Sequence, residues 1–184
     1  LAMGFINSVI AQGLVDQDYV EGRLASAIDQ FKWKMFGRTD IVLHTADITR
    51  NRNGFERLKD SSFRDRFYEE LNLMMSELEY TVVSCAVRKD EHLASFGVAA
   101  LDPYLLSLDT VVEQFCFCLD DEDEGVIVAE MRGPTLDRQI ELAWLNLKIQ
   151  GTKHIQAVEL ERRIKAFNLR AKSSNLAGLQ LADL

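Results

Sequence analysis

Charged side chains near the ends of predicted elements are the residues of this sequence best suited to carry chemistry. Glu130 follows the apolar run 126–129, and open α/β sheets bind their ligands at the carboxyl ends of the strands. Arg132, two residues later, would lie on the same face of an extended chain. These two residues therefore form either an internal ion pair or part of a site for a metal ion or a substrate.

Two other carboxylates stand on predicted helices, and each has a structural alternative. Asp183 comes three residues after Gln180, so both side chains project from one side of the last helix. Asp183 is either a site residue or a capped or solvated carboxylate. Asp137 lies in the first turn of its helix, where the macrodipole favours an acidic side chain. A structural role therefore competes with a catalytic one at Asp137.

A histidine and an aspartate follow another short apolar run. His44 and Asp47 are three residues apart and come directly after the residues 41–43. Such a pair can serve in acid–base catalysis or bind a ligand, whereas a lone histidine is usually structural. The sequence alone leaves both interpretations open.

The elements that must position these residues alternate between β-branched runs and amphipathic stripes. This alternation predicts one three-layer α/β domain over residues 1–184, with helices on both faces of one sheet and a single core. The predicted strands lie near 3–10, 41–44, 80–88 and 125–130, and the predicted helices at 18–36, 63–79, 104–119 and 135–149. A further strand near 164–167 and a short C-terminal helix complete the pattern.

The composition is that of a globular protein of the cytoplasm. Of the 184 residues, 47% are hydrophobic and 27% charged, and no apolar run approaches the roughly 18 residues that a membrane helix needs. The three cysteines include no CxxC pair, so neither a disulfide framework nor a zinc knuckle is indicated. No phosphate-binding glycine loop of the GxGxxG or GxxxxGK[ST] type is present, which disfavours a nucleotide-binding protein.

The net charge is unevenly distributed along the chain. The protein carries a net charge of -8, which argues against indiscriminate binding of nucleic acid. Between residues 132 and 172, however, nine Lys and Arg side chains stand against four acidic ones, a local charge of +5. One segment of the chain is therefore basic within an acidic protein.

Four local patterns together resemble a known family. They are LHTADI at 43–48, EMRG at 130–133, KSSN at 172–175 and GLQLADL at 178–184. In order and spacing they are similar to the bacterial domain of unknown function 3800 family, which looks like a member of the ribonuclease-H-like superfamily. The family normally opens with a strand carrying an Asp-Glu-Ser motif, whereas the first fifteen residues here contain no acidic residue. We therefore expect that the chain begins one strand late and stops within its last helix.

The resemblance implies a ribonuclease-H-like mixed sheet and a divalent-metal-dependent, nuclease-like activity with Mg²⁺ or Mn²⁺ as cofactor. It implies catalytic roles for Glu130, Asp183, His44 and Asp47, and metal binding by Glu130, Asp183 and Asp137. It also implies substrate contacts from Arg132, Lys172, Asn175 and Gln180. The basic segment would then follow the backbone of a nucleic acid, with Arg162, Arg163 and Lys165 facing the same cleft as Glu130.

Two function classes therefore compete. The first is a metal-dependent phosphodiester hydrolase, which requires the carboxylates of Glu130 and Asp183 to converge across a separation of 53 positions. The second is a non-catalytic binding or scaffold domain with a degenerate acidic site, forming a homodimer through the apolar helix 104–119. The acidic net charge and the absent first motif favour the second class.

Overall fold

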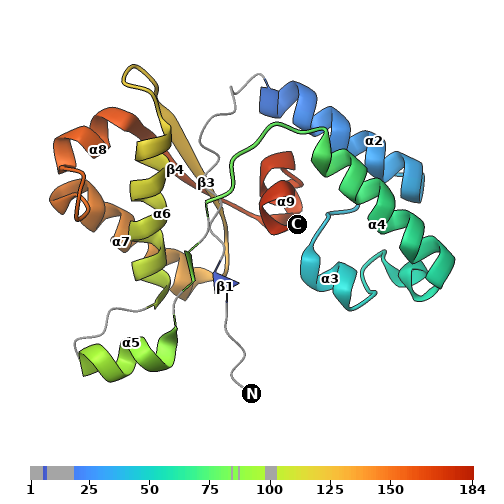
Figure 1. Ribbon diagram of the computed structural model, residues 1–184, viewed down its shortest axis with the longest axis horizontal. Coiled ribbons are helices and arrows are strands. Elements are labelled where there is room, and N and C mark those ends of the chain that lie inside the picture. The colour runs from blue at the N-terminus through green and yellow to red at the C-terminus, as the bar shows by residue number, and fades with distance from the viewer. Residues whose placement is uncertain (1–5, 8–18, 84, 87, 98–102) are drawn as a thin grey trace. The chain divides into compact units, whose positions relative to one another are not determined.

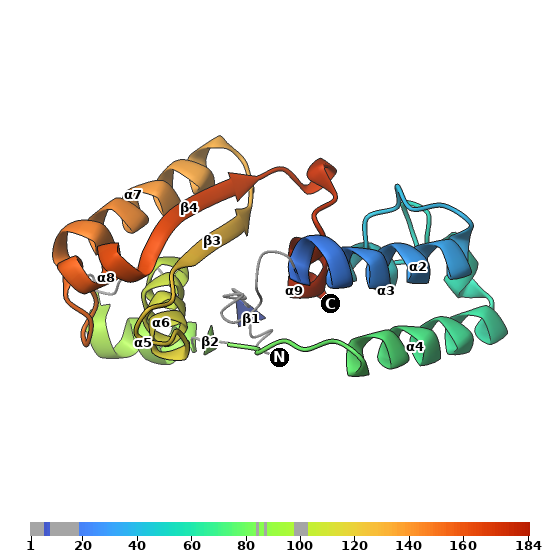
Figure 2. The same cartoon turned by 90° about the horizontal axis from the view of Figure 1, so that it is seen from above.

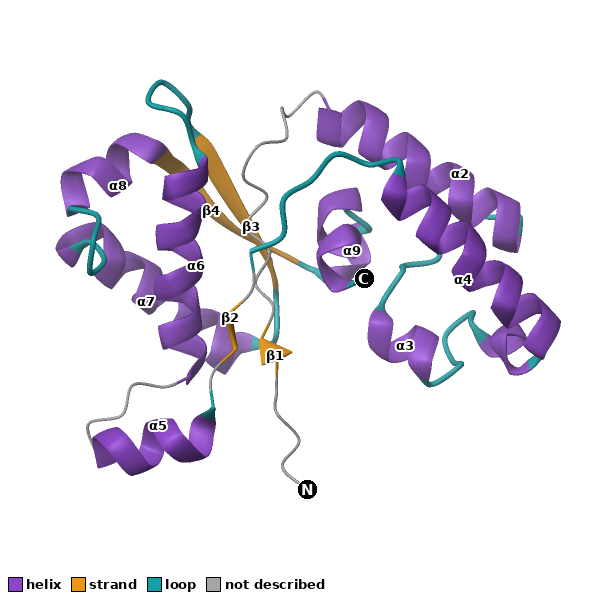
Figure 3. Cartoon of the chain, viewed as in Figure 1, coloured by secondary structure: helices purple, strands orange, loops and turns teal. Residues whose placement is uncertain are grey.

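The chain folds into two compact units. The computed structural model describes residues 6–7, 19–83, 85–86, 88–97 and 103–184. Residues 1–14 and 81–171 form one unit, which we call the mixed unit because its described part holds both helices and strands. Residues 15–80 and 172–184 form the other, which we call the helical unit. Figure 1 shows the elements of both units, and Figure 3 shows no strand in the described part of the helical unit.

The helical unit is built from two long helices and several short ones. A π-helical turn, η1 (Val20–Leu24), leads into α2 (Ala25–Phe36), and α4 (Ser61–Ser76) is the second long helix. Between them lie α3 (Thr45–Thr49) and a 3₁₀ turn, η2 (Glu56–Lys59). The chain returns to this unit with a 3₁₀ turn, η4 (Lys172–Ser174), and with α9 (Ala177–Asp183). The C-terminal segment 172–184 therefore belongs to the same unit as residues 15–80.

Helix boundaries in the helical unit follow ordinary capping chemistry. Helix α2 ends at Gly37, whose left-handed backbone (φ 68°) suits glycine and whose N–H bonds to the carbonyl of Trp33. Helix α4 begins after Asp60, whose carboxylate accepts the N–H of Phe63 at 2.8 Å. The core beneath these helices is rich in aromatic rings that meet edge to face, among them Phe31, Phe36, Phe55 and Phe67.

The mixed unit contains a parallel strand pair with a helical connection. Strand β3 (Gly125–Glu130) pairs with β4 (Ile164–Arg170), and α7 (Pro134–Gln150) and α8 (Ala157–Arg163) connect them. Helix α6 (Pro103–Cys118) contributes the largest share of the core, and Figure 2 shows α7 running alongside the two strands. A short antiparallel pair, β1 (Ile6–Asn7) with β2 (Cys85–Ala86), and α5 (Lys89–Phe96) complete the described part.

The predicted helices and the mixed α/β composition are confirmed. The helices expected at 18–36, 63–79, 104–119 and 135–149 correspond to η1 with α2, to α4, to α6 and to α7. The strand expected near 164–167 is β4. None of the described helices is long and apolar enough to cross a membrane.

Within the described residues, the structure does not show the predicted single sheet or single core. The described strands form two separate two-stranded sheets, and the buried apolar residues fall into two clusters, one in each unit. Residues 41–44 are not a strand, because the N–H of Leu43 donates to the side chain of Gln180 instead of to a neighbouring strand. The strand expected at 80–88 is limited to Cys85–Ala86 among the described residues, and most of the one expected at 3–10 lies outside them.

Gly151, which follows α7, offers a direct test of the mixed unit. Its backbone has φ 75°, and a Cβ atom there would overlap the carbonyl oxygen of Ile155 and lie 2.9 Å from the nitrogen of Ala157. Gly151→Ala should therefore lower the free energy of unfolding by about 3 kcal/mol. Gly37→Ala is the matched control, because it has a similar φ of 68° but open space around the added carbon; about 1 kcal/mol is expected there.

The measurement uses the two tryptophans, one in each unit. Trp144 stacks on Phe167 inside the mixed unit, so its fluorescence in a Trp33→Phe background reports the unfolding of that unit. Trp33 in a Trp144→Phe background reports the helical unit, in which the Gly37 control lies. Equal losses of stability for the two glycine variants would contradict the steric argument.

Candidate functional site

The candidate site of the helical unit is organised around one buried aspartate. Asp47 lies in α3, and only 3% of the residue is exposed. Its Oδ2 accepts hydrogen bonds at 2.9 Å from Nδ1 of His44 and at 2.7 Å from Nζ of Lys172. Its Oδ1 accepts from Nε of Arg52 at 2.7 Å and from Nδ2 of Asn53 at 3.0 Å. We call these five residues the Asp47 cluster.

Local sequence explains how the partners reach Asp47. His44 has an extended backbone at the N-terminus of α3, so a spacing of three residues brings its ring over the carboxylate of Asp47. After α3 the chain turns through Asn51, Asn53 and Gly54, all with positive φ. Asparagine and glycine tolerate this conformation better than other residues. The turn returns Arg52 to α3, where its N–H bonds to the carbonyl of Asp47 at 3.1 Å.

The Asp47 carboxylate is held in its charged form. Burial alone would raise its pKa, but hydrogen bonds from Lys172, Arg52, His44 and Asn53 outweigh burial and lower the pKa well below the usual range. Asp47 is therefore ionised throughout the physiological pH range. An anion that accepts from Nδ1 of His44 also favours the tautomer in which that nitrogen carries the proton and Nε2 has the free lone pair.

Helix α9 is attached to the segment before α3 by side-chain hydrogen bonds to its backbone. Gln180 is buried, and its Oε1 accepts the N–H of Leu43 at 2.9 Å while its Nε2 donates to the carbonyl of Asn175 at 3.0 Å. Asp183 accepts the N–H of Thr45 on Oδ2 at 2.7 Å, and its carbonyl accepts the hydroxyl of Thr45. These hydrogen bonds join residues that are far apart in the sequence: 137 positions separate Leu43 from Gln180, and 138 separate Thr45 from Asp183.

A buried lysine holds the chain just before α9. Lys32 is fully buried in α2, and its Nζ donates to Oδ1 of Asn175 at 2.9 Å and to the carbonyl of Thr39. Burial lowers the pKa of Lys32, against the opposing influence of Asp29 and Asp40. Asn175 itself has a positive φ of 54°. Lys32 therefore stabilises the turn from which α9 starts.

These attachments bring a second carboxylate close to His44. Nε2 of His44 lies 3.8 Å from Oδ2 of Asp183, and the two side chains are 24% and 38% exposed. Asp183 Oδ1 has no hydrogen-bond partner within the described ranges. His44 thus stands between a buried carboxylate that fixes its ring and a more exposed carboxylate on the solvent side. This arrangement can support proton transfer by His44, or binding of a cation by His44 and Asp183 together.

The structure therefore gathers six of the predicted site residues in the helical unit: His44, Asp47, Lys172, Asn175, Gln180 and Asp183. The side chains of Asn175 and Gln180 attach α9. Their expected contacts with substrate stay a prediction. Glu130, Arg132 and Asp137 lie in the mixed unit. The convergence of Glu130 with Asp183 concerns residues of two different units and stays a prediction.

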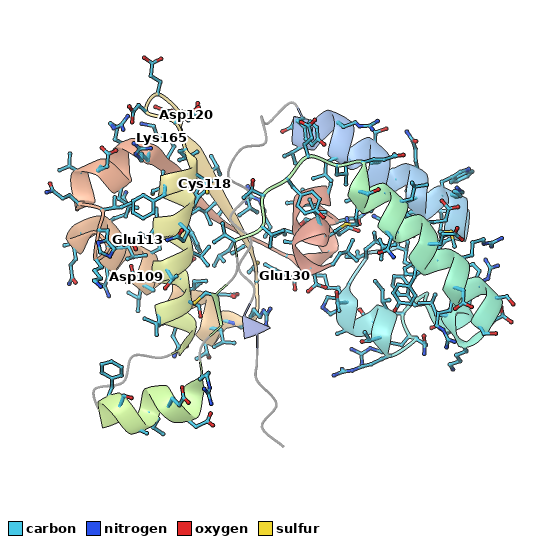
Figure 4. All side chains as sticks on the ribbon, viewed as in Figure 1. Asp109, Glu113, Cys118, Asp120, Glu130 and Lys165 are labelled. Carbon is cyan, nitrogen blue, oxygen red and sulfur yellow. The ribbon has the colours of Figure 1, made fainter. Side chains whose placement is uncertain are left out.

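In the mixed unit, Asp137 lies in the first turn of α7 and binds a backbone N–H group, which is a structural role. Its Oδ1 accepts the backbone N–H of Arg132 at 2.6 Å, which closes the turn between β3 and α7. Glu130, labelled in Figure 4, is the last residue of β3 and is paired in register with Arg170. An internal ion pair was one of the two interpretations of Glu130 and Arg132. The described side chains form no such pair between these two residues.

The basic segment of the mixed unit is engaged in ion pairs. Arg162 and Arg163 both pair with Glu159, and Arg163 also reaches Asp121. Lys165, labelled in Figure 4, pairs with Glu124 at 2.9 Å. Arg163 further donates to the carbonyls at the end of α6, including that of Leu119 at 3.0 Å. Acidic neighbours thus offset the charges expected to attract nucleic acid.

The sequence patterns did not single out Arg52, Asn53 or Lys32 as residues of the site. Arg52 and Asn53 bind Asp47, and the signal for them was the turn-forming run Asn51-Arg52-Asn53-Gly54 directly after the predicted site pair. Lys32 interrupts the apolar face of a predicted helix, and a charged residue at such a position requires a buried partner. Nothing in the sequence pattern identified Thr45 as the partner of Asp183.

The described residues contain no group of three or more His, Cys, Asp or Glu side chains that could hold a metal ion. Both oxygens of Asp47 are used by four donors, so this carboxylate is not free to bind one. The groups of the helical unit's site that could still bind a cation are Nε2 of His44 and the carboxylate of Asp183. Comparisons with protein-family models, with curated proteins and with solved structures find no match for this chain.

Proposed function

We propose that this protein is a divalent-metal-dependent phosphodiester hydrolase of the nuclease type, and that its helical unit contributes His44 and Asp183 to the reaction centre. One observation carries the proposal. The ring of His44 is fixed at Nδ1 by the buried Asp47, and its Nε2 lies 3.8 Å from the partly exposed carboxylate of Asp183. The sequence resemblance to ribonuclease-H-like proteins supports the same class of chemistry and the corresponding fold.

Asp183 fits a divalent cation as one of its ligands. His44 beside it is left as the base, because the single lone pair on Nε2 cannot bind an ion and accept a proton at the same time. Mg²⁺ and similar ions need only one or two protein carboxylates, because water and substrate phosphates complete their coordination. A bound ion would acidify a water molecule and stabilise the charge that develops on phosphate. The sequence resemblance implies Glu130 as a further ligand.

The chain's own residues have distinct roles in this proposal. Asp47 orients His44 and keeps Nε2 available to accept a proton from the attacking water. Asp183 supplies negative charge for the cation, and Thr45 holds this carboxylate through its backbone N–H. Lys172, 36% exposed at the edge of the cluster, contributes positive charge toward an anionic substrate.

His44→Gln tests the proposal most directly. The assay follows cleavage of a single-stranded DNA, a single-stranded RNA and bis(4-nitrophenyl) phosphate by the full chain with Mn²⁺, and with EDTA as the metal-free control. Loss of the proton acceptor should slow hydrolysis about 100-fold. His154→Gln is the matched control, because His154 is exposed in the mixed unit and only its backbone forms hydrogen bonds among the described residues. No Mn²⁺-dependent cleavage by the wild type, or equal rates in both variants, would refute the proposal.

The scaffold alternative uses the apolar helix 104–119 as the contact between two copies. In the structure, the corresponding helix α6 uses Leu108, Val111, Val112 and Phe115 in the core of the mixed unit itself. Phe117 is the one large hydrophobic side chain that is exposed on the described part of this helix. The apolar character of α6 is therefore explained within one chain.

A further inference from the structure

We propose that Arg52, with Lys172 beside it, forms a phosphate-binding subsite at the Asp47 cluster. The proposal deepens the hydrolase function and rests on it for the identity of the substrate. Arg52 anchors itself through Nε alone, at 2.7 Å from Oδ1 of Asp47. Its two terminal nitrogens, Nη1 and Nη2, have no hydrogen-bond partner in the part of the chain that the structure describes.

The anchoring presets the guanidinium for an anion. A guanidinium offers five N–H donors in a planar fork, and two parallel donors match two oxygens of a phosphate. With Nε fixed on a buried carboxylate, the plane of the fork is set before a ligand arrives, so less conformational entropy is lost on binding. The Arg52 side chain is 49% exposed, so its free nitrogens are accessible to a ligand.

The local charge favours the same ligand. Asp47 supplies one negative charge, but two cationic side chains, Arg52 and Lys172, contact its two oxygens. Asp183 adds a carboxylate beside His44, but among the described residues it contacts neither Arg52 nor Lys172. The five residues of the Asp47 cluster therefore carry one unit of positive charge. Both cations contact the same carboxylate that binds the His44 ring. A non-bridging phosphate oxygen placed there would lie next to the group that we assign to proton transfer.

The contrast with the rest of the protein makes the assignment specific. The basic side chains of the mixed unit at 162, 163 and 165 are paired with acidic neighbours. Arg57 lies over the ring of Phe63 and donates to the carbonyl of Met35. Arg52 combines an ion-pair anchor, two free donors and proximity to a histidine–carboxylate pair. A purely structural arginine would need the anchor but not the free donors.

The test measures binding of inorganic phosphate by nuclear magnetic resonance, using the full chain in EDTA at constant ionic strength with chloride as the competing anion. The Nε–Hε signal of Arg52 reports the site directly. Arg52→Gln should keep a donor to Asp47 but remove the fork, and it should weaken phosphate binding at least about tenfold. Arg50→Gln is the matched control, since Arg50 is exposed two residues away and has no contact with Asp47 among the described residues. Its phosphate affinity should stay within about twofold of the wild type.

Two outcomes would overturn the subsite. One is the absence of saturable phosphate binding by the wild type, and the other is an equal loss of affinity in the Arg52 and Arg50 variants, which would indicate only general electrostatic attraction. Because EDTA removes divalent metal, phosphate binding in this assay does not depend on hydrolysis. Failure of the hydrolase function with phosphate binding intact is therefore distinguishable from failure of the subsite. If both hold, Arg52→Gln should raise KM for the phosphodiester more than it lowers kcat.

Discussion

Asparagine in place of Asp47 is expected to lower the free energy of unfolding of the helical unit by about 4 kcal/mol at neutral pH. The substitution keeps the shape of the side chain but removes the charge that four donors share. It also turns an amide N–H₂ toward donors that have no other acceptor in the cluster. Lys172 and Arg52 are partly exposed, so water compensates some of their loss, whereas the buried amide that replaces the carboxylate stays poorly matched.

The stability difference should depend on pH in a defined direction. The folded-state pKa of Asp47 lies below the value in an unfolded chain, so its charge stabilises the fold above the unfolded pKa, and this contribution is lost as pH falls. The gap between wild type and Asp47→Asn should therefore be constant above about pH 5. It should shrink by about 1.4 kcal/mol for each pH unit below about pH 4.

Hydrogen exchange followed by mass spectrometry can assign the loss to one unit. Peptides from α3 and α9 should exchange faster in Asp47→Asn, while peptides from α6 and α7 should keep their protection. Asp40→Asn is the control, because Asp40 also binds an arginine, Arg38, but on the surface. Its removal should change exchange little. Equal effects of the two substitutions, or a stability gap that does not vary with pH, would contradict the central role of Asp47.

The parts of the fold that the sequence predicted well are those encoded by local periodicity. Helices α2, α4, α6 and α7 each carry an apolar stripe long enough to specify both type and approximate bounds. The segment 41–43 is β-branched and apolar, but its backbone partner is a glutamine side chain from the last helix. A partner 137 positions away leaves no local signal. The prediction of a strand there was therefore wrong for a reason that a local pattern cannot reveal.

For the candidate site, the sequence singled out His44 and Asp47 as two residues three apart, and the structure joins them by a hydrogen bond. The turn residues after α3 gave a signal for a chain reversal, but the direction in which Arg52 points depends on the buried charge of Asp47. The sequence did not indicate that Gln180 and Asn175 hold backbone groups, because a polar side chain near a site can do this as well as contact a ligand.

Asp183→Asn is expected to abolish metal-dependent phosphodiester cleavage while leaving the helical unit folded. Asparagine retains an oxygen that can accept the N–H of Thr45, so α9 should stay attached, and Gln180 supplies a second attachment. Only the charge that would attract a cation is lost. Mn²⁺ affinity should fall at least about tenfold, because ligand charge strongly sets affinity for hard cations. The hydrolysis rate should fall about 1,000-fold or more.

Two further carboxylate variants make this test discriminating. Asp137→Asn should leave Mn²⁺ affinity unchanged, because the structure uses Asp137 to bind the backbone of Arg132. Glu130→Gln should weaken Mn²⁺ binding together with Asp183→Asn if the two carboxylates share an ion, as the sequence predicts. Calorimetric titration with Mn²⁺ measures all three variants on the full chain, and circular dichroism confirms that each is folded. Unchanged Mn²⁺ affinity in a folded Asp183→Asn protein would refute the assignment of Asp183 as a metal ligand, and the proposed hydrolase centre would fail with it.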